Sequence, residues 1–371
     1  MVSIRIFYRV QSKNRLRELD FLRGIAIILV IFRHQVLFDF LQTMGWIGVD
    51  LFFVLSGFLV SGLLFREYQK FGSINPKLFL IRRAFKIYPI FYLTIIIYLI
   101  PRILLHKLDV TKLFYDLIFI QNYALGWGYL YTASWSLAVE EHFYFGLALL
   151  LWFIFNKKVI KMESNPNRFT SFELLITTIL LTVLGLRFVS NIYFPEEEVR
   201  HITMTHLRID SLFFGVLIAY WYYFKQETLM AFYTKHQSKL LIVAVSFLAF
   251  TPFIEPLHSF FVKTIGFSLL YLSFGIFLIH FLSNKNINYQ INSLFSATVV
   301  NFISKIGFCS YSIYVIHSFI ITCVDILQIK NRFIAFAIVF SASVFGGFVM
   351  TFVIEKFFLN YRDKFFPSRT V

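Results

Sequence analysis

The first apolar run of the chain carries two side chains that could do chemistry, Arg23 near its start and His34 at its end. They are eleven positions apart. That spacing returns a helix to within about 20° of its starting direction and rises ~16 Å, so both groups project from one face. A guanidinium binds anions, and a neutral imidazole can take the proton of a hydroxyl. The pair predicts an extended ligand, and coenzyme A has that shape: phosphates at one end, a narrow arm, and a thioester at the other.

A cluster of cations stands at the start of the third apolar run, where Arg82, Arg83 and Lys86 follow one another closely. Arginine forks onto phosphate oxygens, whereas lysine offers a point charge. Together with Arg23, these residues form the predicted binding site for the phosphates of an acyl-CoA donor. The alternative is that the cluster only anchors the span by positive charge on the inner side of the membrane.

Two carboxylates lie at the depth predicted for His34. Asp50 begins the second apolar run, and Glu140 lies in the stretch Trp135–Tyr144. A carboxylate behind a neutral imidazole orients the ring and makes it a competent general base. We therefore predict His34, Glu140 and Asp50 as the catalytic group. Each acid could instead form an ordinary buried ion pair that joins two helices.

Three further ionisable side chains are candidates for contact with the second substrate: His317, Arg208 and Asp210. Such groups are costly inside apolar spans, so each is a functional candidate. His317 could line the same passage as His34, or it could be a core histidine bonded between helices. Arg208 and Asp210 could flank the acceptor's entrance or simply pair. Arg33 and Arg187 are expected to reach outward to the membrane surface.

The composition describes the elements that must position these groups. Of 371 residues, 58% are apolar and 15% are charged, whereas a soluble domain is about half apolar and a quarter charged. An ordinary soluble enzyme and a disordered chain are therefore excluded, and an all-α, polytopic transmembrane helical bundle is predicted. We expect about ten spans, at residues 20–40, 46–65, 84–101, 136–156, 172–192, 207–224, 240–255, 264–283, 306–328 and 333–354. The stretch 113–134 is interrupted by polar residues and glycines, so we expect an interfacial or re-entrant segment there.

The formal net charge of +15 indicates cytoplasmic loops that face anionic lipid, and no nucleic-acid partner is expected. Ten spans with the N-terminus inside place most lysines and arginines on the inner side, so both termini are predicted to be cytoplasmic. A single membrane domain is expected over residues 1–371, with a basic arm at 1–19, the bundle at 20–354 and a tail at 355–371. The two cysteines fit no metal pattern, and no metal is expected.

In its motifs the chain resembles the acyltransferase-3 family of integral-membrane O-acyltransferases. The matching stretches occur in the family's order and are Leu19–His34, Gly48–Phe58, Arg83–Pro89, Trp135–Tyr144, Arg208–Gly215 and Gly307–His317. The resemblance implies about ten membrane helices and a cytoplasmic acyl-CoA donor, commonly acetyl-CoA. It implies transfer to a hydroxyl, usually on a sugar of lipopolysaccharide, peptidoglycan or exopolysaccharide.

The resemblance also assigns residues. The family's first-span arginine and histidine correspond to Arg23 and His34, and its Trp-Ser-Leu-x-x-Glu acid corresponds to Glu140. One position departs, because the third-span Arg-x-x-Arg pattern is here Arg83-x-x-Lys86, which keeps the charge but loses a forked contact. Some relatives carry an additional C-terminal hydrolase-like domain. The chain ends at residue 371 without one, so we expect direct transfer.

The hypothesis from the sequence is a bacterial inner-membrane enzyme that moves an acyl group from acyl-CoA to a carbohydrate or lipid-linked glycan hydroxyl. His34 acts either as general base or through a covalent acyl-imidazole. The main alternative is a proton-coupled transporter or flippase, with His34, Glu140 and His317 as a proton relay. A non-catalytic sensor or scaffold is the third.

Overall fold

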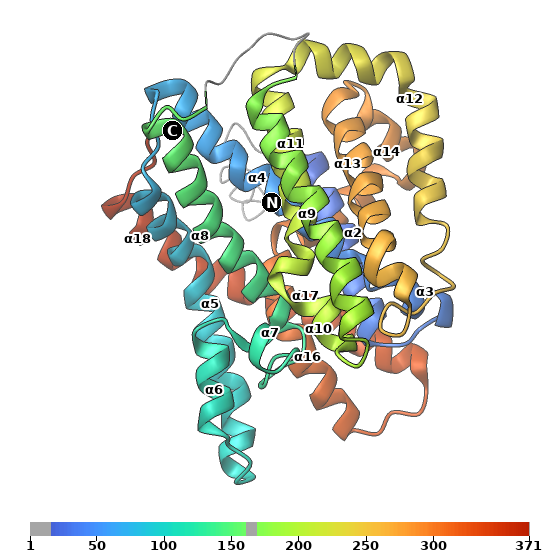
Figure 1. The fold of residues 1–371 in the computed structure, drawn as a ribbon. Helices are drawn as coiled ribbons and strands as arrows, with labels where there is room; N and C mark the ends of the chain where they lie inside the picture. Colours follow the sequence, from blue (N-terminus) through green and yellow to red (C-terminus); the bar gives the residue numbers. More distant parts are fainter. Residues whose placement is uncertain (1–15, 161–168, 371) are drawn as a thin grey trace, which may run out of the picture.

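The computed structural model describes residues 16–160 and 169–370, and all regular structure in these ranges is helical (Figure 1). In chain order the helices are α2 (Arg17–His34), α3 (Asp39–Met44), α4 (Ile47–Phe71), α5 (Pro76–Leu104), α6 (Val110–Leu117), α7 (Gln121–Ala124), α8 (Ser134–Asn156), α9 (Ser171–Tyr193), α10 (Glu198–Thr203), α11 (Thr205–Phe224), α12 (Gln226–Leu248), α13 (Phe267–Ser283), α14 (Ile287–Phe295), α15 (Ala297–Phe308), α16 (Ser310–Ile326), α17 (Arg332–Val349) and α18 (Lys356–Phe365). Short π-helical segments, η1 (Val262–Gly266) and η2 (Met350–Glu355), precede α13 and α18. The prediction of an all-α architecture is confirmed.

Seven helical segments of the described chain are long and apolar enough to cross a membrane. The pair α15 and α16, which bends by 80° at its break, is either an eighth, broken span or a re-entrant loop. The two remaining predicted spans correspond to α2 and α12, which are too polar to meet the same standard. The count of about ten spans and the cytoplasmic position of both termini remain predictions.

The predicted span at 240–255 has the wrong limits. The helix α12 starts at Gln226 and ends at Leu248, and turns follow as far as residue 258. Pro252 explains this end, because a proline disfavours helical backbone at the residue before it and offers no N–H to continue the ladder. The helix therefore starts before the predicted span and ends inside it.

The stretch 113–134 is broken into short pieces, as expected. It contains the end of α6 and the four-residue α7, neither of which is long enough to span a bilayer. The carboxylate of Asp116 accepts hydrogen bonds from the backbone N–H groups of Tyr129 at 3.0 Å and Leu130 at 2.8 Å. These bonds tie the returning chain to α6, so the segment folds back before α8 begins.

Small residues let α2 and α15 cross at backbone contact. A Cβ atom on Gly24 would lie 2.2 Å from the carbonyl oxygen of Ile303, and one on Gly307 would lie 1.8 Å from that of Asp20. Only glycine permits such an approach, which is a recurrent device for packing helices in membranes. The crossing fixes Arg23, the neighbour of Gly24, beside the start of α16.

The crossing of α4 and α11 uses the same device. A Cβ atom on Gly57 would meet the carbonyl oxygen of Leu212 at 2.0 Å, and one on Gly215 would meet that of Val54 at 2.3 Å. This contact brings the polar first turns of both helices together inside the bundle, so their charged side chains must satisfy one another.

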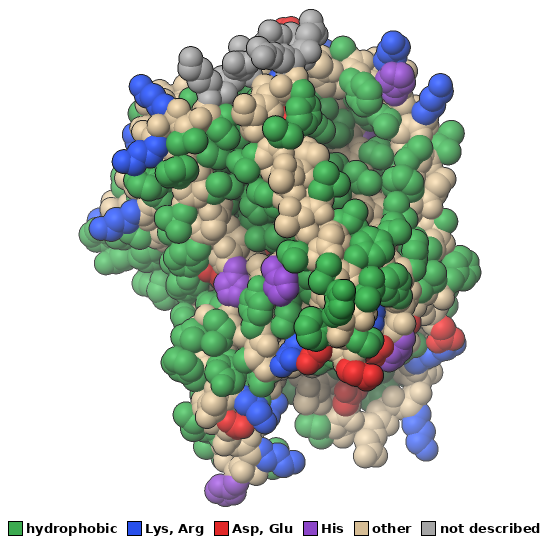
Figure 2. Space-filling model, in the orientation of Figure 1, with side chains coloured by type: hydrophobic (Ala, Val, Ile, Leu, Met, Phe, Trp, Pro, Cys, Tyr) green, Lys and Arg blue, Asp and Glu red, His purple; other side chains and the backbone are tan. Residues whose placement is uncertain are grey.

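The surface of the molecule agrees with a membrane environment. Figure 2 shows hydrophobic side chains over the middle of the visible face, while lysines and arginines lie towards its ends. Large apolar side chains on the long helices point outward, among them Leu181 (62% exposed) and Val245 (60% exposed). Such exposure is costly in water and favourable against lipid chains, so the chain is an integral membrane protein.

Candidate active site

A cavity of about 120 Å³ lies among α2, α4, α5, α8 and α16. Its lining brings together three of the four predicted donor-binding cations, Arg23, Arg83 and Lys86, with the predicted acid Glu140. Aromatic rings and apolar side chains form most of the remaining wall. Charged groups in an apolar wall are expensive unless something neutralises them, so this lining suits an anionic ligand with a narrow apolar part.

The cations of the cavity differ in how they are held. The guanidinium of Arg83 lies 4.8 Å from the ring centre of Tyr144, and its buried Nε atom has no hydrogen-bond partner among the described residues. The ammonium of Lys86 donates to the buried carboxylate of Glu355 at 2.5 Å. An Nε–H without a partner keeps a donor available, so Arg83 is the cation best placed to receive an anion.

Glu355 was not a candidate from the sequence, although a signal for it exists. It directly follows the last predicted apolar run and lies 269 positions after its partner Lys86. An acid at the end of an apolar run indicates a buried partner, but one sequence does not say which. The π-helical segment η2 ends at this residue, and its Thr351 hydroxyl donates to Ser312 at 2.8 Å.

Arg82 does not join the other cations. It points to the C-terminal segment, where it donates to Asp363 at 3.0 Å and to the carbonyl oxygen of Phe366. Successive residues on a helix face directions about 100° apart, so Arg82 and Arg83 cannot both face the cavity. The sequence alone could not decide which of the two would do so.

The carboxylate of Glu140 is held inside the cavity wall. It accepts hydrogen bonds from the hydroxyl of Ser56 at 2.6 Å and from that of Tyr144 at 3.0 Å. Its neighbour Glu141, which the sequence analysis did not select, also lines the cavity and accepts from the hydroxyl of Tyr88 at 3.0 Å. The hydrogen bonds of Glu140 thus go to hydroxyls and not to His34.

Asp50 belongs to a second polar group, away from His34. One of its oxygens lies 2.7 Å from Nη2 of Arg208, and the hydroxyl of Ser211 lies 3.4 Å from the same oxygen. The guanidinium of Arg208 also lies 3.7 Å from the ring centre of Phe267. Asp50 is therefore the ion-pair partner of Arg208 and does not orient the predicted base.

The same group contains Arg187, which was expected to reach outward to the membrane surface. That expectation is wrong: its side chain is 0% exposed and donates to Asp210 at 2.6 Å and to Ser268 at 2.8 Å. Arg187 faces the bundle because a buried carboxylate on α11 faces α9, and a paired charge costs less than an unpaired one. Asp210 thus pairs with Arg187 and not with Arg208. Arg33, by contrast, lies in the last turn of α2 and pairs with Glu255 at 2.5 Å.

His34 is exposed at the end of α2, beyond the cavity lining. Its Nδ1 lies 2.9 Å from the carbonyl oxygen of Val30. A carbonyl oxygen only accepts hydrogen bonds, so in the neutral ring Nδ1 carries the proton and Nε2 carries the lone pair. The backbone thereby orients the imidazole as a base without a carboxylate.

His317 lies next to His34, with the ring centres 5.1 Å apart. It is fully buried, and its Nδ1 lies 2.5 Å from the carbonyl oxygen of Tyr314. Tyr314 in turn lines the cavity, and its hydroxyl lies 2.5 Å from that of Ser136. The order in space is therefore cavity, Tyr314, His317, His34, so the predicted anchor and the predicted base are joined through α16.

Across the described residues, no group of three or more histidine, cysteine, aspartate or glutamate side chains has an arrangement that could hold a metal ion. The ionisable side chains described at this site are two imidazoles, two carboxylates and the cations of the cavity.

Comparison with known proteins supplies the family. The family model described as an acyltransferase domain, Acyl_transf_3, matches residues 16–353. The peptidoglycan O-acetyltransferase OatA of Listeria monocytogenes is 28% identical over 379 residues, which cover 94% of this chain and 57% of that protein. A putative O-acetyltransferase of Staphylococcus aureus is 26% identical over 394 residues, covering 98% of this chain and 61% of that protein. The O-acetyltransferase OatA of Staphylococcus aureus is 25% identical over 345 residues, covering 87% and 53%.

The chain thus spans a little over half the length of these curated relatives. No solved structure matches it significantly. The family match covers nearly the whole chain, including the first-span arginine and histidine and the fourth-span acid. This protein belongs to the acyltransferase-3 family of integral-membrane acyltransferases.

Proposed function

We propose that the protein is a bacterial inner-membrane O-acetyltransferase that takes the acetyl group from acetyl-CoA on the cytoplasmic side. It transfers this group to a hydroxyl of a cell-envelope glycan on the outer side. The observation that carries the proposal is the spatial order of the site: a buried cationic cavity, then Tyr314 and His317, then the exposed imidazole of His34. A donor that must offer an anionic head and a distant reactive end fits this order.

The donor half of the proposal rests on Arg23, Arg83 and Lys86. Their charges lie in a wall that is mostly apolar and aromatic and also contains Glu140 and Glu141, and in such a wall attraction to a phosphate is stronger than in water. The arm of the donor runs along the aromatic side of the cavity toward Tyr314. The thioester reaches His34 only after the side chain of Tyr314 turns away, so Tyr314 separates the donor from the acceptor in the resting protein.

The chemical step follows from the tautomer of His34. Its Nε2 takes the proton of the acceptor hydroxyl, and the resulting alkoxide attacks the thioester carbonyl carbon. The carbon–sulfur bond breaks, and the thiolate of coenzyme A leaves and takes up the proton held by the imidazole. In the covalent route Nε2 itself attacks the carbonyl carbon, and the thiolate of coenzyme A leaves. The acceptor hydroxyl then attacks the carbonyl carbon of the acyl-imidazole, the imidazole of His34 leaves, and the hydroxyl proton passes to the thiolate. Both routes require an unprotonated Nε2 within reach of the outer side.

The acceptor is proposed from the relatives. One is named a peptidoglycan O-acetyltransferase, and the exposure of His34 at the outer end of α2 allows a bulky glycan to approach. We therefore propose a sugar hydroxyl of a cell-wall or lipid-linked glycan as the acceptor class.

The test is a reaction with the purified protein in detergent, given acetyl-CoA and a peptidoglycan fragment. Free thiol release is measured together with the acetyl ester by mass spectrometry. Ester formation with stoichiometric thiol supports the proposal. Failure to consume acetyl-CoA with any glycan, combined with solute flux in liposomes that needs no acyl donor, would favour a transporter instead.

A further inference from the structure

The C-terminal segment makes a charged contact that the proposed reaction does not use. A single oxygen of Asp363, on α18, receives hydrogen bonds from two arginines: Nη2 of Arg82 at 3.0 Å, and Nε and Nη2 of Arg362 at 2.9 and 2.8 Å. The two arginine side chains are 20% and 17% exposed, while that of Asp363 is 54% exposed. Two guanidiniums that converge on one oxygen form the kind of site that binds a phosphate.

This contact lies close to the lining of the cavity. Arg82 is one helical turn from Lys86 on the same face of α5, a rise of ~6 Å. Lys86 lines the cavity and pairs with Glu355, which directly precedes α18. The chain's own carboxylates thus cover two cations that the sequence predicts as donor ligands.

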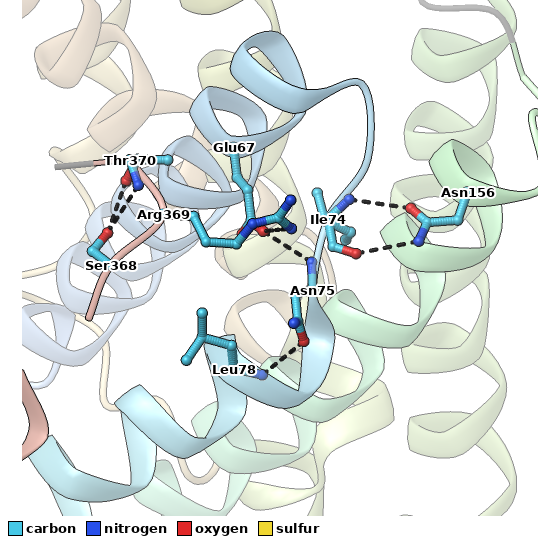
Figure 3. Close-up of polar contacts among 8 residues, drawn as sticks. All are labelled: Glu67, Ile74, Asn75, Leu78, Asn156, Ser368, Arg369 and Thr370. Carbon is cyan, nitrogen blue, oxygen red and sulfur yellow. Dashed lines mark hydrogen bonds and ion pairs between the residues drawn. The ribbon is translucent and has the colours of Figure 1, made fainter. Parts of the chain in front are cut away.

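The segment that carries Asp363 is fastened at both sides of this contact. The ring of Phe85 on α5 lies 5.9 Å from that of Tyr361 and 5.5 Å from that of Phe366. Farther along, Arg369 donates to Glu67 at 2.6 Å (Figure 3). Its guanidinium also stacks 4.4 Å from the ring centre of Phe71.

The anchor at Glu67 is itself part of the folded turn between α4 and α5. The same Glu67 oxygen accepts the backbone N–H of Asn75 at 3.0 Å, and the Asn75 side chain caps α5 by accepting the N–H of Leu78 (Figure 3). Asn156 holds this turn from α8 through paired bonds to Ile74. The C-terminal segment therefore docks on a preformed surface, and the exposed Asp363 contact is the part that can open without undoing the anchor.

We propose that Arg82 and Arg362 form a phosphate-binding subsite at the donor entrance, and that Asp363 occupies this subsite until a phosphate group of the acyl-CoA donor displaces it. The inference rests on the proposed function, because it takes the donor to be a CoA thioester. Asp363 then acts as an internal competitor, whose effective concentration is set by its short tether to Arg362. We call the contact of Asp363 with Arg82 and Arg362 the clasp. The clasp keeps the donor entrance closed in the absence of donor.

The experiment measures the dissociation constant of coenzyme A by calorimetry on the purified full chain in neutral detergent. Asp363→Asn removes the competing charge and keeps the shape, so binding should tighten about threefold to fivefold. Arg362→Gln removes one fork of the subsite and should weaken binding about fivefold to tenfold. Lys364→Gln is the matched control, since it removes an equal charge from the same helix outside the contact.

A double variant tests whether the effects share one site. In an Arg82→Gln background the gain from Asp363→Asn should disappear, because the subsite is already broken.

Titration with 3′-dephospho-coenzyme A identifies the phosphate: loss of the Arg362→Gln effect points to the ribose phosphate, and its persistence points to the diphosphate. Both results support the subsite.

Three results overturn the proposal: unchanged or weaker binding in Asp363→Asn, equal behaviour of Arg362→Gln and Lys364→Gln, or loss of the Asp363→Asn gain in nanodiscs that contain acidic phospholipid. The last would show that a lipid headgroup and not the donor fills the subsite. If wild-type protein does not bind coenzyme A at all, the proposed function fails. If it binds and the variants do nothing, only the clasp fails.

Discussion

The imidazoles of His34 and His317 lie with their ring centres 5.1 Å apart, one exposed at the end of α2 and the other buried within α16. Each ring has its Nδ1 next to a backbone carbonyl of its own helix. That bond fixes the neutral tautomer with the proton on Nδ1. The proposed base therefore has a basic Nε2 and a buried imidazole as its neighbour.

Replacing the proposed base should separate chemistry from binding. His34→Ala should lower kcat by about 10² to 10⁴, the usual contribution of general acid–base catalysis, while the dissociation constant of acetyl-CoA stays near the wild-type value. Single-turnover thiol release and calorimetry measure the two quantities. His236→Gln on α12, outside the cavity lining, is the control. An equal loss of binding and turnover in His34→Ala would contradict a catalytic role.

Tyr314 should act as the wall between donor and water. Tyr314→Ala removes the ring that closes the cavity, so acetyl-CoA should be hydrolysed faster in the absence of acceptor. Tyr314→Phe keeps the ring and loses only the hydroxyl contacts with Ser136 and with the carbonyl oxygen of Ala133, so its hydrolysis rate should stay close to wild type. Thiol release without glycan measures this leak. Equal hydrolysis rates for the two variants would mean that the ring of Tyr314 does not separate the donor from water.

Arg83 should contribute more to the affinity for the donor than to the rate of turnover. Arg83→Gln removes a charge-assisted contact to phosphate and should raise the dissociation constant of acetyl-CoA about tenfold, with kcat nearly unchanged. Arg102→Gln is a matched control, because Arg102 is also on α5 and also stacks on a tyrosine, 4.3 Å from the ring centre of Tyr129. The prediction is wrong if both variants change affinity alike.

Asp50 should prove structural. Asp50→Asn leaves Arg208 buried and uncompensated, which typically costs about 3–5 kcal/mol, whereas replacing both partners by apolar residues is often neutral. We expect Asp50→Asn to lower the thermal midpoint, and the double variant Asp50→Leu with Arg208→Met to recover most of the stability. Recovery of activity together with stability would confirm that the pair holds helices. A stable but inactive double variant would argue for a chemical role.

The crossing of α2 and α15 should be intolerant of a single methyl group. Gly307→Ala would place Cβ 1.8 Å from a backbone oxygen of α2, which a small side-chain adjustment cannot relieve. Gly146→Ala on α8 meets nothing within 4 Å and is the matched control. Thermal unfolding in detergent should show a markedly lower midpoint for Gly307→Ala and little change for Gly146→Ala.

Local patterns predicted part of this site well. The all-helical bundle follows from apolar runs, and the three cavity cations Arg23, Arg83 and Lys86 follow from charge where an apolar wall should be. The break at 113–134 follows from its glycines and polar residues. Each of these inferences depends on the intrinsic behaviour of residues close together in sequence.

The partners of the charged groups could not be predicted in the same way. Arg187 and Asp210 are 23 positions apart, Arg208 and Asp50 are 158 apart, and Lys86 and Glu355 are 269 apart. Which of several buried acids a cation meets depends on how helices cross, and a single sequence carries no record of that geometry. For the same reason, the sequence alone did not determine whether the side chain of Arg82 or that of Arg83 faces the cavity.

The unbroken course of α2 has a consequence for which donors the enzyme can use. Arg23 and His34 are carried by one continuous helix of 18 residues, so their axial separation of ~16 Å is set by the rise of the helix alone. The helix α2 thus fixes the distance between the two side chains. Under the proposed mechanism, a small activated acetyl compound without a long arm cannot touch both ends of it, and carrier length becomes a criterion of selection independent of the acyl group itself.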